Sequence, residues 1–342
     1  MQNLDFSPVI AAFVAFGACA LSGYVVIPFL HKLKFGQTIL DIGPKWHKSK
    51  QGTPTMGGIM IFFGLILGTV CAVGFSFIFG GKFASSVMLG STLGRFLAGL
   101  ALAVCMGLIG FVDDYIKVAK KRNLGLTAKQ KTFLQFFVSA AYLFLLYLAG
   151  MKTTWIPFVG NVSVVQGAGL LFWPISLLFI YGFTNAVNLT DGVDGLASTV
   201  TLIVACFFMF AASYLSDAGY NILAAALAGA CAGFVLWNSH PAKVFMGDTG
   251  SMFLGGAVVA LSFGIGRPIM LIFAGILYIA EALSVMIQVA YFKKTKKRLF
   301  KMAPIHHHFE MSGWSEEKIV LVFSLVTFIG CVISILPLIL DF

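Results

Sequence analysis

Continuous apolar runs dominate the sequence, and each has about the length needed to cross a bilayer. Hydrophobic residues make up 59% of the 342 positions, and charged residues only 11%. A helix needs about 20 apolar residues to span a membrane, whereas a barrel strand alternates apolar and polar positions. We therefore expect an all-α polytopic membrane protein with one domain over residues 1–342. Ten spans are predicted, at 7–30, 54–79, 94–116, 132–150, 167–187, 196–215, 219–237, 250–265, 268–292 and 319–340.

The basic residues between these runs are distributed unevenly. Nineteen of the 23 Lys and Arg residues fall in alternate connections or at their borders. The remaining four, on the opposite side, are Lys82, Arg95, Lys152 and Arg267. Cytoplasmic loops of membrane proteins carry the excess of Lys and Arg, so the basic connections are predicted to be cytoplasmic. Ten spans then place both termini outside the cytoplasm.

The charge, the cysteines and the first apolar run argue against several kinds of partner, site and targeting segment. The net charge of +10 is explained by the same rule and by binding of anionic lipid or phosphate, so we expect no nucleic-acid partner. All six cysteines fall inside apolar runs, which favours small buried side chains over metal ligands. The first run is long enough to remain as a span, so no cleavable signal is expected. The segment WIPFVGNVSVV in an outward loop is compatible with a small surface hairpin.

Nine of the thirteen acidic residues gather on the predicted cytoplasmic side. Insertion into a bilayer does not require this arrangement, but a site that holds a metal and phosphates does. Three junctions between spans supply five aspartates, and we expect these to converge on one cytoplasmic cleft. They are Asp113, Asp114, Asp191, Asp194 and Asp248.

Asp113 and Asp114 end the third span in the motif GLIGFVDDYIK. A solvated helix end would favour Lys or Arg there, because the helix dipole disfavours acids at the C-terminus. Adjacent helical side chains also diverge by about 100°. One of the two aspartates is therefore a candidate Mg²⁺ ligand and the other a candidate general base.

The segment NAVNLTDGVDGLA repeats a polar residue every third position, with Asn188, Asp191 and Asp194. Asp194 could also cap the next helix, although this would explain only one of the three residues. The spacing does not match an EF-hand loop, which needs a later glutamate.

In NSHPAKVFMGDTGS, Asp248 lies between glycines just before the eighth span, where a capping role is the alternative. The same short loop contains Asn238 and Phe245. We expect the Phe245 ring to stack on a planar base while Asp248 points at a metal. The loop does not match the phosphate-binding P-loop pattern.

Two further motifs supply groups that suit phosphate. Consecutive side chains diverge, so the run His306, His307 and His308 fits zinc poorly and fits phosphate contact or proton relay better. Lys50 precedes the second span and Thr55 lies at its start, and both are candidates for binding phosphate. The alternative is an ordinary basic loop with a Thr53 cap and Pro54 in the first helical turn.

Glu281 lies well inside the ninth span, where a carboxylate is costly and needs a partner or water. No partner can be named from the sequence, and a protonated structural residue is an equal alternative.

Taken together, the motifs GTPTMGG, FVDDYIK, NLTDGVDGLA, VFMGDTGS and PIHHHFE occur in this order in a chain of ten predicted spans. The chain resembles the polyprenyl-phosphate sugar-phosphate transferase superfamily over essentially its whole length. GTPTMGG and PIHHHFE resemble, more narrowly, its phospho-N-acetylmuramoyl-pentapeptide-transferase branch. No motif position departs from the pattern.

The resemblance implies that undecaprenyl phosphate attacks the β-phosphate of UDP-N-acetylmuramoyl-pentapeptide, with Mg²⁺ as cofactor and UMP as leaving group. It also implies a homodimer in the bacterial inner membrane, with its active site on the cytoplasmic side. Asp248 would bind the metal, and Asp113 or Asp114 would bind metal or act as base, with direct attack and Asp113 as base favoured. His306 is a further candidate catalytic residue. The other implied substrate or phosphate contacts, together with Thr55 from the motif before the second span, are Lys50, Lys117, Lys129, Asn188, Asp191, Asp194, Asn238, Phe245, Gln288, His307 and His308.

Two other interpretations differ in class. A transporter would place carboxylates near the bilayer midplane and show broken helices in repeated positions, whereas here only Glu281 lies in mid-span. A structural scaffold would not need the aspartates. Within the enzymes, the alternative is a related transferase that moves N-acetylglucosamine phosphate to the same lipid.

Overall fold

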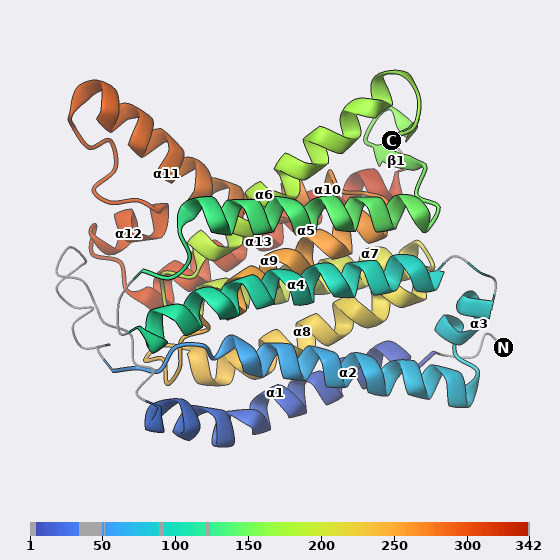
Figure 1. The fold of residues 1–342 in the computed structure, drawn as a ribbon, viewed down its shortest axis with the longest axis horizontal. Coiled ribbons are helices and arrows are strands. Elements are labelled where there is room, and N and C mark those ends of the chain that lie inside the picture. The colour runs from blue at the N-terminus through green and yellow to red at the C-terminus, as the bar shows by residue number, and fades with distance from the viewer. Residues whose placement is uncertain are drawn as a thin grey trace.

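The computed structural model describes residues 5–33, 50, 52–88, 90, 92–120 and 124–340, and in these ranges it is mainly helical. Long helices lie side by side along the longest axis of the molecule (Figure 1). The elements are α1 (Ser7–Lys32), α2 (Gly58–Phe79), α3 (Lys82–Met88), α4 (Thr92–Ala119), α5 (Ala128–Leu148), β1 (Thr153–Ile156), β2 (Gly160–Ser163), η2 (Gly167–Leu171), α6 (Phe172–Thr190), α7 (Leu196–Tyr214), α8 (Ala218–Asn238), α9 (Gly247–Gly264), α10 (Met270–Ala274), α11 (Ile276–Thr295), α12 (Ile305–Glu310) and α13 (Glu316–Ile339).

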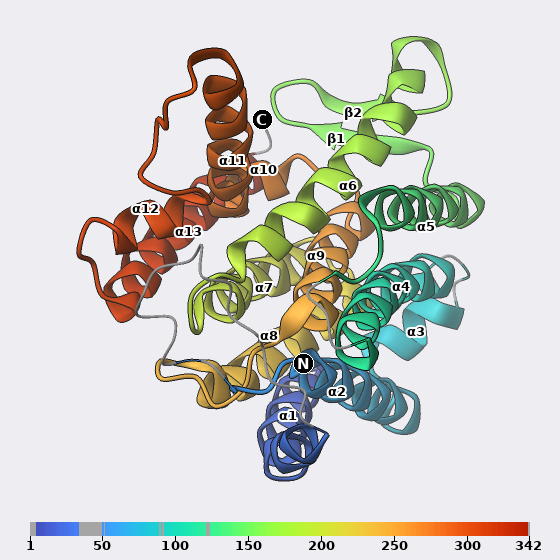
Figure 2. The ribbon, with the colours of Figure 1, turned by 60° about the vertical axis from the view of Figure 1, so that its left-hand side comes forward.

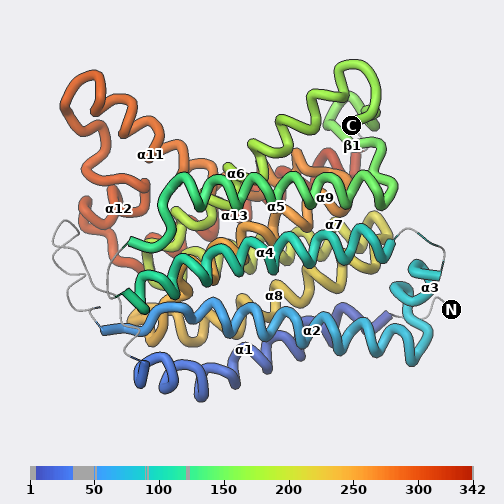
Figure 3. Tube along the Cα trace, viewed as in Figure 1, coloured from blue at the N-terminus to red at the C-terminus, as the bar shows by residue number. Residues whose placement is uncertain are grey.

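Within the described ranges, nine helices are long and apolar enough to cross a membrane, which confirms an all-α polytopic membrane protein. The predicted eighth span corresponds to α9, which falls outside that set yet runs along the others in the bundle (Figure 3). The predicted ninth span is not one helix. It breaks at Gly275 between α10 and α11.

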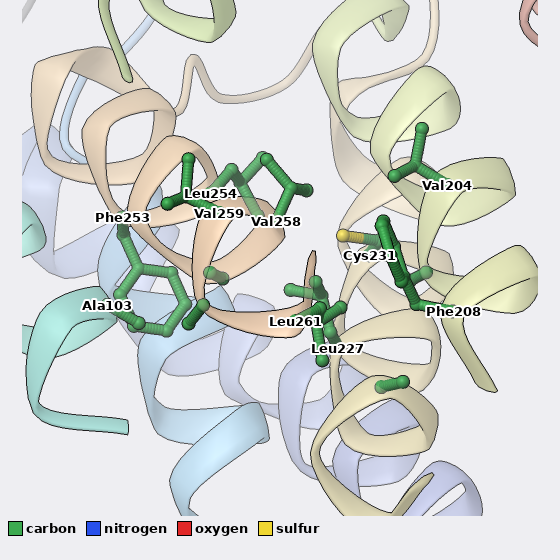
Figure 4. Packing of buried hydrophobic residues seen from close by; sticks show 14 of the residues in the cluster. Ala103, Val204, Phe208, Leu227, Cys231, Phe253, Leu254, Val258, Val259 and Leu261 are labelled. Carbon is green, nitrogen blue, oxygen red and sulfur yellow. The ribbon is translucent and has the colours of Figure 1, made fainter. Parts of the chain in front are cut away.

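Helix α9 is the centre of the bundle. Every residue from Thr249 to Gly264 is buried, and α9 packs most extensively against α4 and also contacts α6, α2 and α7. Figure 4 shows its side chains Phe253, Leu254 and Val258 among those of neighbouring helices. Glycine permits the closest of these approaches, because a β-carbon at Gly110 of α4 would overlap the Asp248 carbonyl group.

Helix α11 is the opposite case. Only Leu277, Tyr278, Glu281 and Ser284 are buried along its length. In Figures 1 and 2 the helix diverges from the rest of the bundle, and the chain returns from its far end to α12. Its apolar surface is therefore turned outward, as expected for a helix that contacts lipid.

The two ends of the bundle differ. One end carries the connections α4–α5, α6–α7, α8–α9 and the α12 region, while both labelled termini lie at the other end with α3 and β1 (Figure 1). We call these the loop end and the terminal end. The hairpin predicted in WIPFVGNVSVV is confirmed at the terminal end: β1 and β2 pair antiparallel, with Thr153 opposite Ser163.

Candidate active site

Three carboxylates meet at the loop end, and we call them the aspartate cluster: Asp113, Asp114 and Asp248. One oxygen of each lies within 4.8 Å of the others. Asp113 and Asp114 come from the last turns of α4, whereas Asp248 lies in the first turn of α9. The close packing of α4 on α9 therefore brings together two motifs separated by more than a hundred residues.

The negative charge of Asp114 is disfavoured at the C-terminal end of its own helix, α4, but is favoured at the N-terminus of the neighbouring helix, α9. Its Oδ2 accepts hydrogen bonds of 2.8 Å from both the backbone N–H and the hydroxyl of Thr249, in the first turn of α9. The N-terminus of a helix stabilises negative charge. Asp114 is thus a cap supplied to α9 by α4. The predicted alternative, that Asp248 is itself the cap, is wrong because α9 begins one residue earlier, at Gly247.

Lys117 and Lys131 lie within the aspartate cluster. Lys117 Nζ is 2.6 Å from Asp113 and 3.0 Å from Asp248. Lys131 Nζ is also 3.0 Å from Asp248. Two ammonium groups thus face one carboxylate. The cluster therefore carries less net negative charge than three aspartates alone would give it.

The sequence interpretation selected Lys129 rather than Lys131, and the structure separates these two residues. Lys129 is exposed, whereas Lys131 is half-buried against Asp248. Both lie near the start of α5. The Thr127–Gln130 capping box fixes where this helix begins. Helical spacing on α5 could have indicated that only one of the two faces the bundle.

Asn188 and the backbone of the α4–α5 connection hold the aspartates in place. The Asn188 side-chain amide donates to Asp248 Oδ1 at 2.9 Å and to Ser251 at 2.7 Å. Leu126 N–H donates to Asp113 Oδ1 at 2.8 Å. Each of these bonds leaves the cluster less freedom to rearrange.

A second group of charges, the lysine-bridged cluster, joins the connections around it: Lys50, Asp194, His240 and Glu316. Lys50 Nζ lies 2.7 Å from Asp194 and 2.6 Å from Glu316. His240 Nδ1 lies 3.0 Å from the other Asp194 oxygen. Glu316 was not selected from the sequence, because its contacts come from distant segments and no motif marks it. His240 lies in the motif NSHPAKVFMGDTGS but was not chosen as a site residue, because its contact with Asp194 depends on tertiary packing.

Asp191 lies between the two clusters. Its side chain forms no hydrogen bond to any residue that the structure describes. Burial, followed by the nearby carboxylates of Asp248, Asp114 and Asp194, raises the pKa of Asp191 well above its ordinary value. Asp191 is therefore suited to be a neutral hydrogen-bond donor rather than an anion.

The remaining α6–α7 and α8–α9 residues shape these connections. Asn238 accepts from Gly195 N–H at 3.1 Å and donates to the Val244 carbonyl at 2.9 Å. The capping role considered for Asp194 is wrong, because Gly195 occupies the N-cap of α7. Asp194 instead belongs to the lysine-bridged cluster.

The segment before α2 pairs with the one before α9. Phe245 N–H donates to the Pro54 carbonyl at 2.8 Å, and Gly57 N–H donates to the Phe245 carbonyl at 2.9 Å. The Phe245 ring is half-buried, and a side chain at Gly247 would meet the Thr55 hydroxyl. The cap considered at Thr53 is wrong, because α2 begins at Gly58 with Gly57 as its N-cap.

The three histidines point to different partners, as expected for consecutive residues. His306 Nδ1 lies 3.0 Å from Glu281, and both side chains are buried. This identifies the partner that the sequence could not name. His307 pairs with Glu310, and His308 accepts from Lys301 N–H at 3.2 Å. The His306 ring also lies against Gly192, where any side chain would overlap it.

Gln288 has a local role in the structure. Its side-chain oxygen accepts from Leu299 N–H at 3.0 Å and Phe300 N–H at 2.9 Å, which closes the turn after α11. No described contact joins it to the aspartate cluster. Its predicted contact with substrate stays a prediction.

Comparisons with known proteins cover nearly the whole chain. The Glycosyl transferase family 4 sequence model matches residues 96–265. The first signature of phospho-N-acetylmuramoyl-pentapeptide-transferase matches residues 50–62. A protein of that name from Clostridioides difficile is 46% identical over 95% of this chain and 96% of its own length.

The chain belongs to the phospho-N-acetylmuramoyl-pentapeptide-transferase family. Relatives of the same name from Acetivibrio thermocellus and Caldicellulosiruptor bescii are 48% and 42% identical. The first covers 99% of both chains, and the second covers 97% of this chain and 98% of its own. Membership confirms the resemblance drawn from the five motifs. The signature at residues 50–62 includes Lys50 and Thr55, and the longer match includes both halves of the aspartate cluster.

Proposed function

We propose that this chain transfers phospho-N-acetylmuramoyl-pentapeptide from its UDP-linked donor to undecaprenyl phosphate. An oxygen of the lipid phosphate attacks the β-phosphorus of the donor. The bond between that phosphorus and the bridging oxygen breaks, and UMP leaves with the bonding electron pair. The observation that carries this proposal is the aspartate cluster, which two lysines face at one end of a membrane bundle.

The aspartate cluster fits Mg²⁺. Carboxylate oxygens are the ligands this ion prefers, and three of them lie within 4.8 Å of one another. Asp248 and Asp114 would hold the ion, while Asp113, also a predicted ligand, is left to act as base in the favoured route. Asp248 is the residue on which Asn188 and both lysines converge. When bound, Mg²⁺ supplies positive charge that offsets the repulsion between two phosphate-bearing substrates.

Lys117 and Lys131 offset the same repulsion. Phosphoryl transfer depends on positioning and electrostatic stabilisation more than on covalent help from the protein. Ammonium groups anchored to Asp248 lie where phosphate oxygens of both substrates would meet. Anchoring restricts their movement, so little reorganisation is needed during transfer.

Direct attack with Asp113 as base is the favoured route. Bonds from Leu126 N–H and Lys117 orient the two Asp113 oxygens, which leaves the carboxylate at a fixed angle beside Asp248. A covalent route would pass through an aspartyl phosphate. Acid-quenched turnover followed by mass spectrometry of the peptides distinguishes them, and a phosphorylated aspartate would exclude direct attack.

The donor's nucleoside is proposed to bind over the paired segments before α2 and α9. Phe245 would stack on uracil, and Lys50 of the lysine-bridged cluster would contact a phosphate. A neutral Asp191 can donate a hydrogen bond to an oxygen of the UDP-linked substrate, whereas an ionised Asp191 would repel that oxygen. Asn188 and Asn238 serve mainly to position Asp248 and the Gly195 turn.

We further propose that the loop end is cytoplasmic and that the chain resides in the bacterial inner membrane as a homodimer. The uneven distribution of Lys and Arg supports the orientation. Cysteine labelling at Lys152 and at Lys297 in intact cells tests it: only the first should react with an impermeant reagent. Chemical crosslinking in membranes tests the dimer.

One assay tests the reaction itself. Purified protein, Mg²⁺ and undecaprenyl phosphate are incubated with UDP-N-acetylmuramoyl-pentapeptide or with UDP-N-acetylglucosamine, and UMP release is measured. Release with the first donor alone is expected. Release with the second donor alone would support the related transferase, and release with neither, together with solute uptake by sealed vesicles, would support a transporter.

A further inference from the structure

Glu281 is a buried acidic side chain that has no part in the proposed reaction. It lies in α11 and is fully buried, and its Oε2 is 3.0 Å from Nδ1 of His306, which is fully buried as well. The chain leaves the bundle along α11 and returns to α12, which carries His306 (Figure 2). The pair therefore ties the returning segment to the buried face of α11.

The His306 ring lies against the connection between α6 and α7. A β-carbon added to Gly192 would overlap Nε2 of this ring, so the ring contacts the Gly192 backbone directly. Gly192 does not have a positive φ, and its backbone would therefore accept a side chain. The space for that side chain is taken by His306. Gly192 follows Asp191 and precedes Asp194 by two residues, so the contact lies between two of the predicted substrate contacts.

Other segments support the part of this connection that leads into α7. Asp194 N–H donates to Glu316 Oε2 at 3.0 Å, at the start of α13. Gly195 N–H donates to Asn238 Oδ1 at 3.1 Å, at the end of α8. Both hydrogen bonds lie on the α7 side of Gly192. They leave the beginning of the connection to be held in another way.

Asp191, at the beginning of the connection, depends on its neighbours for its position. Its side chain forms no hydrogen bond to any residue that the structure describes. Its backbone N–H reaches the Asn188 carbonyl at 3.3 Å, which is longer than a usual hydrogen bond of this type. The next residue, Gly192, rests on His306. The orientation of the His306 ring therefore helps to decide where Asp191 lies.

A purely structural role does not account for the buried pair. Glu281 Oε1 and His306 Nε2 are buried and have no hydrogen-bond partner among the described residues, which costs stability. Replacing a buried ion pair by apolar side chains is often neutral or stabilising. Tyr278, on the same buried face of α11, already links this helix to α7 through a 2.8 Å hydrogen bond with Thr201. Holding α11 in the bundle therefore does not require an acid and a histidine.

We propose that Glu281 is a positioning residue for binding of the UDP-linked donor, an inference that rests on the proposed function. Its carboxylate accepts the Nδ1 hydrogen of His306 and fixes the orientation of the ring. The ring supports Gly192, and Gly192 places Asp191 where it meets an oxygen of the donor. Glu281 and His306 thus act on the donor through the α6–α7 connection and not by touching the reacting atoms.

The test separates KM from kcat for UMP release. Glu281→Leu should raise the KM for donor about 10-fold and change kcat less, because the ring loses the hydrogen bond that orients it. Glu281→Gln should stay close to wild type, since its amide oxygen still accepts from Nδ1–H. Tyr278→Phe is the matched control: it removes a buried hydrogen bond from the same face of α11, so it should lower the Tm and leave the KM unchanged.

A double-mutant cycle tests the route through Gly192. Gly192→Ala should raise the KM for donor in the wild type, because the added methyl group displaces the His306 ring. The same substitution should have a smaller effect in His306→Ala, where the ring is gone. Equal effects in both backgrounds would exclude this route.

Three outcomes would overturn the inference while leaving the proposed function intact. They are an unchanged KM in a folded Glu281→Leu protein, a Glu281→Gln protein as impaired as Glu281→Leu, and a rise in KM of the same size in Tyr278→Phe. Folding of each variant is checked by its Tm. Failure of the wild type to release UMP from UDP-N-acetylmuramoyl-pentapeptide would instead refute the proposed function itself.

Discussion

The aspartate cluster and the lysine-bridged cluster contain the same kinds of residue but are built differently. The first is carried by helices, with Asp113 and Asp114 on α4 and Asp248 on α9. The second joins connections: Lys50, Asp194 and His240 lie between helices, and only Glu316 begins one. Helix packing fixes the first cluster, whereas ion pairs hold the second together. We infer that the first is preformed for metal and transfer, and the second organises the loops that bind donor.

The largest expected effect is a loss of turnover, without a loss of folding, when Asp248 of the aspartate cluster is replaced. Asp248→Asn should lower UMP release at least about 100-fold, because one designed electrostatic contact commonly contributes that much to a transition state. Turnover is measured at saturating Mg²⁺, and folding is checked by the Tm. Glu317→Gln is the control, because Glu317 is exposed on the same side. Full activity of Asp248→Asn would refute the proposed metal ligand.

The second prediction distinguishes two lysines on α5. Lys131→Gln should reduce turnover about 10-fold, because it removes a charged hydrogen bond worth about 1.5 kcal/mol at Asp248. Lys129→Gln should change it little, because Lys129 is exposed. Steady-state UMP release measures both. A larger loss from Lys129→Gln would favour the choice made from sequence and would contradict the site geometry.

A third prediction concerns the lysine-bridged cluster. Lys50→Met should raise the KM for donor about 10-fold while kcat changes less, because Lys50 orders the donor-binding connections and would contact a phosphate. Glu316→Gln should raise the same KM by a smaller factor, since Asp194 still holds the lysine. Initial rates over a range of donor concentrations give both constants. A fall in kcat alone would place Lys50 in the chemical step.

The smallest effect tests Asp191. A raised pKa in the folded state means that folded protein binds a proton that unfolded protein releases, so the free energy of unfolding falls as pH rises above about 4. Asp191→Asn lacks this dependence. Its Tm, measured in EDTA, should match wild type near pH 4 and exceed it by a margin that grows toward pH 8. A margin that shrinks with rising pH would mean that Asp191 is stabilised as an anion.

Much of this architecture was predictable because the membrane imposes strong rules. The length of the apolar runs identified the helices. It also identified α9, although the polar residues around Asp248 keep α9 out of the set of nine helices apolar enough to cross a membrane. The convergence of Asp113, Asp114 and Asp248 was predicted because the distribution of Lys and Arg assigned the connections that carry them to the same side of the membrane. The break at Gly275 was missed because hydropathy averages over a window and does not register a change of helix direction.

The pairings inside the site were less predictable because they depend on which face each helix turns inward. Asp114 looked like a misplaced acid on α4 until its role at the N-terminus of α9 was visible. The partner of Glu281 is a histidine 25 residues away beyond a long loop, and no periodicity links the two. Such contacts are set by tertiary packing alone.

The complete burial of α9 has a consequence for how the protein responds to its membrane. Helices that face lipid adjust to hydrophobic mismatch by tilting when acyl chains become longer or shorter. From Thr249 to Gly264, α9 is buried among other helices. A change in bilayer thickness therefore does not act directly on the tilt of α9. Asp248 should therefore keep its position across membranes of different composition, while α11 adjusts around it.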